Sequence, residues 1–420
     1  FEKDFIEVDR RVNLLYNTLS GEGLRLFPIP NESNNTWTSN RKLVGLGFQK
    51  RDSLFVAGIL PLYFNTFSKE IPTGNFQESL RLLEQIEKYQ SKFGHEVIPN
   101  ASKINLEILY NEYDVFKNLF SWYLSFGLLL LIAAILHLFK GRGPFGDMLW
   151  IPRVGIYLCF AAHTLGLLAR WYISGHAPWS DAYESIIYIS WATMLFGIVI
   201  GRKFDLALAA TAFVNAMILM VAHWNWLDPA IANLQPVLNS YWLMIHVAII
   251  VASYGPFTLG MILSALSLLF MALLNKRNHG NLRLAIKKLT LLTEITLTIG
   301  LVMLTIGNFL GGQWANESWG RYWAWDPKET WALVSIMIYA LIIHMRLVPK
   351  LNNTWLFSTM GVLGFYAILM TYFGVNFYLS GLHSYAQGDN IVTPGFIYYS
   401  LGVVGILAGI SYFKRKRYPV

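Results

Sequence analysis

The chain has 420 residues, of which 55% are hydrophobic and 14% are charged. Soluble domains carry about 25% charged residues, so this composition excludes an ordinary soluble enzyme. The net charge of +8 is uneven, because residues 1–116 have a balance of −2 and residues 117–420 a balance of +10. This asymmetry favours a soluble segment joined to a membrane domain with basic loops over a nucleic-acid-binding protein.

Residues 1–116 are expected to form a soluble extracytoplasmic segment. Within it, 76–94 and 104–120 show helical periodicity, and the second is predicted to continue into the first membrane span. The polar stretch 31–40 is expected to be a loop. The short apolar run 54–64 is typical of strands or of an interfacial segment.

From residue 117 onward, long apolar runs recur along the chain. A helix needs about 20 apolar residues to cross a hydrocarbon core of about 30 Å, and such a helix satisfies its own backbone groups in lipid. We therefore predict an all-α polytopic membrane domain with about nine transmembrane helices. The predicted spans are 118–139, 152–172, 183–201, 205–222, 241–274, 289–310, 331–349, 355–378 and 395–413.

The distribution of Lys and Arg predicts the orientation of these helices. If residues 1–116 lie outside the cytoplasm, the inner loops and the C-terminal tail hold 16 Lys and Arg residues, and the outer loops hold four. Positive charge accumulates on the cytoplasmic side of membrane proteins. Residues 1–116 and the stretch 311–331 are therefore expected outside.

The most unusual stretch is GGQWANESWGRYWAWDPKETW at 311–331, which is predicted to be an external loop. Its aromatic rings exceed what anchoring at a membrane interface needs, and they offer flat faces for a flat apolar ligand. Asp326 is expected to cap the next helix, with Pro327 at its first position and Glu329 in its first turn. The tryptophans of this stretch are Trp314, Trp319, Trp323, Trp325 and Trp331.

Three histidines are candidate metal ligands. His246 lies near the outer end of a long apolar run and His383 in the external stretch NFYLSGLHSYAQGDN, both on the side of the tryptophans. Two imidazoles beside a flat aromatic surface are typical of a bis-His haem site. His344 lies within a span, where an ionisable group is costly and indicates function. His163 is interpreted as a contact between helices.

The motif WGRYWAWDPKETWALV (319–334) resembles the tryptophan-rich signature of the WWD-domain superfamily of haem-handling proteins. Together with RWYISGHAPWSDAYES (170–185) and the order of the histidines, it resembles CcsA, the membrane half of the system II cytochrome c synthase. The resemblance covers about 117–420. Residues 1–116 are similar in placement to the end of the CcsB partner, so the chain resembles the C-terminal part of a fused CcsBA.

The resemblance implies a site and an activity. His246 and His383 would ligate haem iron at the outer face, the stretch 311–331 with Asp326 would hold the macrocycle, and His344 would be one of two intramembrane ligands. The other intramembrane ligand would come from the CcsB part. Haem b would be the substrate of a haem lyase in the bacterial cytoplasmic (inner) membrane, and apocytochrome c would supply the CxxCH thiols.

Two other classes of function stay open on the sequence. One is a haem exporter or chaperone that presents haem without attaching it. The other is a bis-His b-haem subunit that transfers electrons. The chain has one cysteine, Cys159, within an apolar run, so thiol chemistry here would have to use the sulfur atoms of a partner.

Overall fold

The computed structural model describes residues 2–43, 46–140, 149–201, 204–223, 227–231, 240–379, 381 and 395–419. Over these ranges the fold is helical apart from one pair of two-residue strands. Nine of the described helices are long and apolar enough to cross a membrane. The predicted fold class is therefore confirmed.

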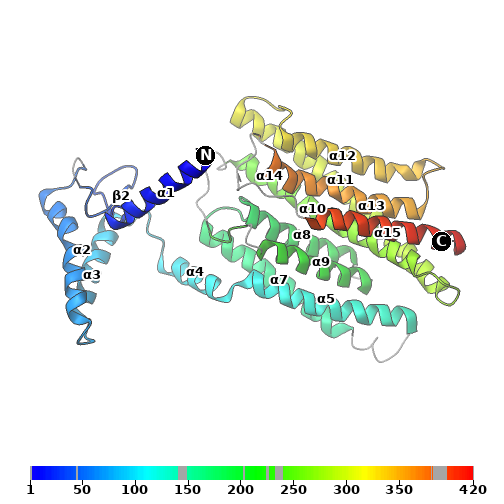
Figure 1. The fold of residues 1–420 in the computed structure, drawn as a ribbon, viewed down its shortest axis with the longest axis horizontal. Coiled ribbons are helices and arrows are strands. Elements are labelled where there is room, and N and C mark those ends of the chain that lie inside the picture. Colours follow the sequence, from blue (N-terminus) through cyan, green and yellow to red (C-terminus); the bar gives the residue numbers. More distant parts are fainter. Residues whose placement is uncertain are drawn as a thin grey trace. The chain divides into compact units, whose positions relative to one another are not determined.

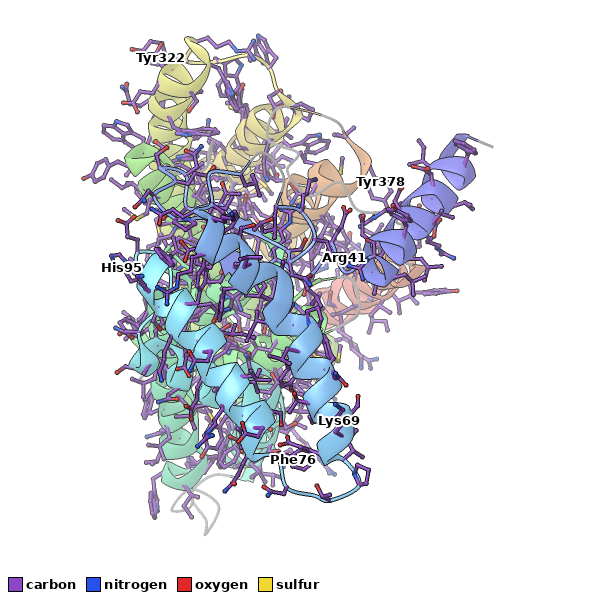
Figure 2. All side chains as sticks on the ribbon, turned by 90° about the vertical axis from the view of Figure 1, so that its left-hand side faces the viewer. Arg41, Lys69, Phe76, His95, Tyr322 and Tyr378 are labelled. Atoms are coloured by element: carbon purple, nitrogen blue, oxygen red, sulfur yellow. The ribbon has the colours of Figure 1, made fainter. Side chains whose placement is uncertain are left out.

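The chain divides into two compact units, residues 1–104 and 105–420. In the first unit, helix α1 precedes a two-stranded antiparallel sheet in which Phe27 pairs with Thr38. Helices α2 and α3 follow as a hairpin, with Lys69 and Phe76 at its turn and His95 at its other end (Figure 2). The elements are α1 (Glu2–Leu19), β1 (Phe27–Pro28), β2 (Trp37–Thr38), α2 (Lys50–Glu70) and α3 (Gln77–Phe93).

Two expectations for the first unit are corrected. Residues 54–64 lie within helix α2, so the strand alternative is wrong. Their buried side chains, Val56, Ile59 and Leu60, follow helical spacing and share a core with α3. The predicted loop 31–40 contains the strand β2. The helix predicted over 76–94 is confirmed as α3.

The helical run predicted over 104–120 is interrupted. Helix α4 (Ala101–Tyr113) ends before Asp114, and α5 (Val115–Lys140) begins after it. Asp114 has a φ of +38°, a conformation that cannot continue a right-handed helix but that aspartate tolerates better than most residues. The side chain of Asn118 donates to the carbonyl of Tyr113 at 2.6 Å and stabilises this break.

The second unit is a bundle of long helices with nearly parallel axes (Figure 1). Helix α10 lies at its centre and contacts α8, α11, α13 and α15. Beyond α5, the elements are α7 (Trp150–Ser174), α8 (Ala182–Gly201), α9 (Asp205–His223), α10 (Tyr241–Ala272), α11 (His279–Trp319), α12 (Pro327–His344), η2 (Met345–Leu347), α13 (Thr354–Leu369), η3 (Met370–Gly374), α14 (Val375–Tyr378) and α15 (Gly395–Arg417).

The close approach of α10 to α8 depends on a glycine. A Cβ atom at Gly255 would lie 2.8 Å from the backbone nitrogen of Thr193 and 3.2 Å from the Cβ of Ala192. Small residues let helix backbones approach in this way when lipid provides no hydrophobic force between them. Helix α10 continues through Pro256, the next residue.

The stretch 311–331 is not one loop, which corrects the expectation from its composition. Helix α11 extends to Trp319, so Trp314 and Trp319 are helical, and Trp331 lies in α12. The connection between the two helices is residues 320–326. Helix α11 ends at Gly320, which has a φ of +70° and donates its N–H to the carbonyl of Asn316, as a glycine C-cap does.

Candidate functional site

His246 lies one turn into α10 at the end of the bundle that holds residues 311–331, which we call the tryptophan end. Its side chain is 5% exposed, and its ring stacks on Trp314 with centroids 5.3 Å apart and an interplanar angle of 28°. Nδ1 donates to the carbonyl of Trp242 at 2.8 Å. In that tautomer Nε2 carries the lone pair that a metal ligand needs.

Helix α11 lies directly against this imidazole. A Cβ atom at Gly311 would lie 3.2 Å from Cδ2 of His246, so the glycine lets the helix approach the edge of the ring. Trp314 is 1% exposed, and it also contacts the ring of Trp319, at 4.7 Å in an edge-to-face arrangement. The structure therefore brings three of the predicted site residues, His246, Trp314 and Trp319, into one aromatic cluster.

The other tryptophans are arranged separately. Trp323 and Trp325 lie in the connection 320–326 with perpendicular rings 5.6 Å apart. Trp325 has a φ of +59°, which is rare and strained for a bulky residue, and its side chain is 69% exposed. Trp331 lies in the second turn of α12, where its carbonyl accepts from the hydroxyl of Thr371.

Asp326 and Glu329 form the start of α12 as predicted. Asp326 Oδ1 accepts from the N–H of Lys328 at 3.1 Å, and Pro327 is the first helical residue. Glu329 Oε2 accepts from the N–H groups of Ala324, at 2.9 Å, and Asp326, at 3.3 Å. This capping box therefore also fixes the backbone on both sides of Trp325.

We expect Asp326→Ala to lower the free energy of unfolding by about 1 kcal/mol, the usual cost of losing an N-cap, and to loosen the connection that carries Trp323 and Trp325. Asp326→Asn is the matched control, because asparagine caps helices equally well. Thermal unfolding followed by tryptophan fluorescence measures both. If the asparagine variant were as unstable as the alanine variant, the role of Asp326 as a cap acceptor would be rejected.

His383 lies outside the described residues. Gly381, two positions before it in the sequence, lies against the cap of α12: a Cβ atom there would overlap Oδ2 of Asp326 and lie 2.9 Å from Cδ of Pro327. Upstream, the ammonium group of Lys328 donates to the side chain of Asn376 in α14 at 2.9 Å. The chain that leads to His383 is thus in contact with the start of α12.

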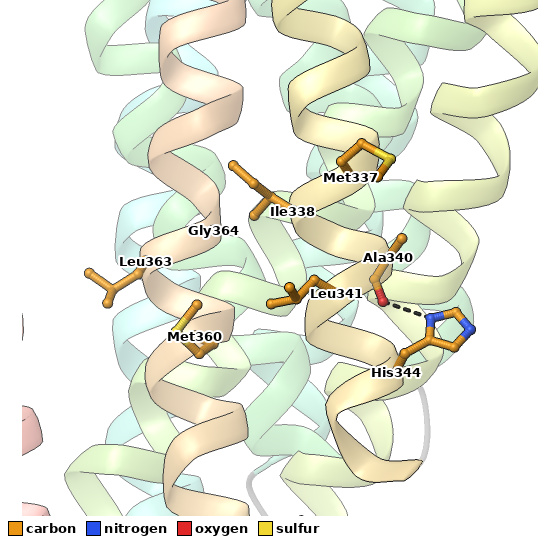
Figure 3. Close-up of a pocket in the computed structure, with 8 residues that line it drawn as sticks. All are labelled: Met337, Ile338, Ala340, Leu341, His344, Met360, Leu363 and Gly364. Atoms are coloured by element: carbon orange, nitrogen blue, oxygen red, sulfur yellow. Dashed lines mark hydrogen bonds between the residues drawn. The ribbon is translucent and has the colours of Figure 1, made fainter. Parts of the chain in front are cut away.

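His344 lies at the opposite end of α12. Its imidazole is exposed, and Nδ1 donates to the carbonyl of Ala340 at 2.7 Å (Figure 3). The ring lines a groove of about 670 Å³, within the size range of ligand pockets. The other lining residues are apolar and come from α12 and α13: Met337, Ile338, Ala340, Leu341, Met360, Leu363 and Gly364.

A buried ion pair connects α7 and α8 at the tryptophan end. Arg170 and Glu184 are both fully buried, with 2.8 Å between Nε and Oε1. Arg170 also donates to the carbonyls of Pro229 and Ala230, at 2.9 and 3.2 Å. These carbonyls precede α10 in the chain. Burial and the neighbouring Glu184 raise the pKa of Asp181, between α7 and α8, to about 6.

Sequence reasoning missed two further groups. His137, near the end of α5, has a buried Nδ1 without a hydrogen-bond partner in the described part of the chain. The signal that could have identified it is its position as an ionisable residue in an apolar run. Arg346, next to the groove, pairs with Glu294 of α11.

His163 is fully buried, contacts Phe116 edge-on and bonds to the carbonyl of Ile187, as a contact between helices does.

The residues around His246 fit haem, because the porphyrin supplies most of the ligands of its iron. Over the described ranges, no three His, Cys, Asp or Glu side chains gather closely enough to hold a bare metal ion. Haem iron needs only one or two axial ligands from the protein. A buried imidazole whose plane is held by one neighbouring indole ring fits that requirement.

Comparisons with known proteins give matches over most of the chain. Residues 179–383 match the family described as Cytochrome C assembly protein. The chain is 43% identical over 399 residues to protein NrfI of Wolinella succinogenes, a match that covers 93% of this chain and 42% of NrfI. It is 34% identical over 308 residues to the cytochrome c biogenesis protein CcsA of Prochlorococcus marinus, which covers 65% of this chain and 97% of that protein.

The chain thus spans less than half the length of NrfI and nearly all of this CcsA. Among solved structures, the cytochrome c haem lyase CcmF aligns with a TM-score of 0.47 and 17% sequence identity. That alignment covers 72% of this chain and 51% of CcmF.

Proposed function

The chain belongs to the cytochrome c assembly protein family, and from this premise we propose that it is a cytochrome c synthase that receives haem and attaches it to apocytochrome c. In this proposal it works in the bacterial inner membrane with an N-terminal CcsB part, on the same or a separate chain. Residues 1–116 are then the C-terminal part of that CcsB portion, and residues 117–420 are the CcsA-like domain.

The observation that carries the proposal is the stack of His246 on Trp314. A buried imidazole with Nδ1 bound to a backbone carbonyl has a fixed ring orientation and a basic Nε2, which is the usual arrangement of a metal-bound histidine. The indole stacked on its face holds the plane of the imidazole, so Nε2 would point at the iron while Trp314 contacted the macrocycle by its edge. His246 is accordingly proposed as one axial ligand of the haem.

His383 is proposed as the second axial ligand at the tryptophan end. Support comes from Gly381, which lies against Asp326 only two positions earlier in the chain. The macrocycle would be held by the WWD segment, which consists of Trp314, Trp319, Trp323, Trp325, Asp326 and Trp331.

His344 is proposed as an intramembrane ligand on the path of haem from the cytoplasm. The groove beside it is lined by apolar side chains of α12 and α13, which suits entry of an apolar molecule from the bilayer. The second ligand at this level would come from the CcsB part.

The proposed orientation puts the tryptophan end outside. Support comes from the basic end of α15, Lys414–Arg417, because Arg415 donates to Asn353, the N-cap residue of α13. Asn353 lies at the end of the bundle opposite the tryptophans. Since positive charge marks the cytoplasmic side, that end would face the cytoplasm.

The chemistry uses groups of the two substrates. Each cysteine thiol of the CxxCH segment adds across a vinyl group of haem, with sulfur bonding to one carbon and the thiol hydrogen to the other. This addition involves no net oxidation or reduction, so it needs no oxidant. The protein contributes position: it holds iron by imidazole, holds the macrocycle on indole rings and leaves one edge for the peptide.

The purified full chain, given reduced haem and a CxxCH peptide, tests the proposal. We expect a peptide product that keeps its haem after denaturation and acid extraction, and no such product with a matched SxxSH peptide. Haem that binds but stays extractable would indicate an exporter. Haem that is reduced by quinol, without any covalent product, would indicate an electron-transfer subunit.

A further inference from the structure

Lys328 is a cation at the tryptophan end that has a neutral partner. Its side chain is half-buried in the first turn of α12, and its ammonium group donates to the amide oxygen of Asn376 at 2.9 Å. In the part of the chain that the structure describes, no carboxylate lies within 4.0 Å of this ammonium group.

Two arginines of the second unit, the buried Arg170 and the exposed Arg346, differ in this respect. Arg170 pairs with Glu184, and Arg346 pairs with Glu294. A cation shielded from water loses hydration energy, and a nearby anion is the usual compensation. The carboxylate of Asp326 acts on the charge of Lys328 through space, but it makes no close ion pair with the ammonium group: its Oδ1 accepts from the N–H of Lys328 and its Oδ2 faces Gly381. Lys328 is therefore a half-buried cation with a neutral hydrogen-bond partner, which is the environment expected of a residue that binds an anionic ligand.

The depth of Lys328 in the bundle follows from ring contacts. Phe257 of α10 stacks on Tyr339 of α12 with centroids 3.9 Å apart, which places these two residues at one level. His246 and Lys328 each lie eleven residues from that level, towards the tryptophan end. At about 1.5 Å per residue, each is about 16 Å above it, so both lie at the same depth.

Helix α11 gives an independent measure of the same depth. Gly300 lies against Phe257, and Gly311 lies against His246. Helix α11 therefore also advances eleven residues between the two levels, which shows that α10 keeps its regular rise across Pro256.

The lateral arrangement matches a carboxylated porphyrin. Helices α10 and α12 both pack against α11 and α13, so the imidazole on α10 and the ammonium group on α12 lie at one depth on two helices that share both neighbours. Haem has its iron at the centre and its two propionate carboxylates at one edge. An ammonium group has three N–H donors, and Asn376 uses one of them, which leaves two for a carboxylate.

We propose that Lys328 binds a propionate carboxylate of the haem whose iron His246 ligates, so that the site selects porphyrins with a free acidic edge. This inference rests on the proposed function. A charge-assisted hydrogen bond to a carboxylate is among the strong ones in proteins, and here it would also set which edge of the macrocycle faces the incoming peptide.

The test compares haem with its propionate dimethyl ester, each titrated into the purified full chain and followed by absorbance. We expect the wild-type chain to bind haem about tenfold or more tightly than the ester. Lys328→Met is expected to weaken haem binding to the level of the ester and to leave the affinity for the ester unchanged, whereas Lys328→Arg keeps the preference. Arg321→Met is the matched control, because it removes an exposed cation of the connection that precedes α12 and should keep the preference.

If the wild-type chain bound haem and its ester with equal affinity, the proposal would be overturned. It would also be overturned if the Lys328→Met variant still bound haem more tightly than the ester. Either result leaves haem binding, and with it the proposed function, intact. If the chain bound neither porphyrin, the proposed function would fail together with this inference.

Discussion

Replacing His246 with alanine is expected to abolish haem retention and cytochrome c maturation. The change removes the proposed iron ligand and leaves a void beside Trp314, whose ring loses its stacking partner. Haem content of the purified chain, measured as the pyridine haemochrome, and the yield of holocytochrome c in cells report the two losses separately.

His246→Phe separates ligation from packing. Phenylalanine keeps an aromatic ring to stack on Trp314 but has no lone pair for iron, so we expect a folded chain that retains as little haem as the alanine variant. His176→Ala is the control, since it removes another imidazole, near Glu184, that is not proposed as a ligand. Wild-type haem content in His246→Phe would remove His246 from the site.

Arg170→Met is expected to destabilise the chain by about 3–5 kcal/mol, because it leaves Glu184 buried without its counter-charge. The carbonyls of Pro229 and Ala230 lose their donors at the same time. The double variant Arg170→Met/Glu184→Leu should recover much of this loss. The shift of the unfolding transition in detergent measures each effect.

The control for this experiment is Arg153→Met. Arg153 pairs with Asp205, but both side chains are partly exposed, so the loss should stay within about 1 kcal/mol. A small loss in Arg170→Met, comparable with that of the control, would contradict the view that the buried pair holds the residues preceding α10.

The membrane helices could be predicted because their signal is local. Each span is a run of apolar residues, and the cap at Asp326, Pro327 and Glu329 follows from three neighbouring residue types. The end of α11 could not be predicted in the same way. The stretch from Gly311 to Trp319 has a polar, glycine-containing composition typical of loops, yet it stays helical because Trp314 and Ala315 bury one face of the helix.

The partners within the site could not be predicted from spacing. Trp314 and His246 are distant in sequence and meet only because α10 and α11 pack together along their length. The same holds for Arg170 with Glu184 and for Lys328 with Asn376, which lie on different helices. A sequence shows which residues are unusual for a membrane span, but the contacts between helices determine which partner each one has.

The central claim is that haem lies against indole rings at the tryptophan end, with its iron bound by His246. A structure of the full chain loaded with haem, determined by cryo-electron microscopy, tests this most directly. The account predicts a macrocycle beside Trp314 whose iron is coordinated by Nε2 of His246. Haem bound elsewhere in the chain, with the His246 ring still packed on Trp314 and away from the iron, would contradict it.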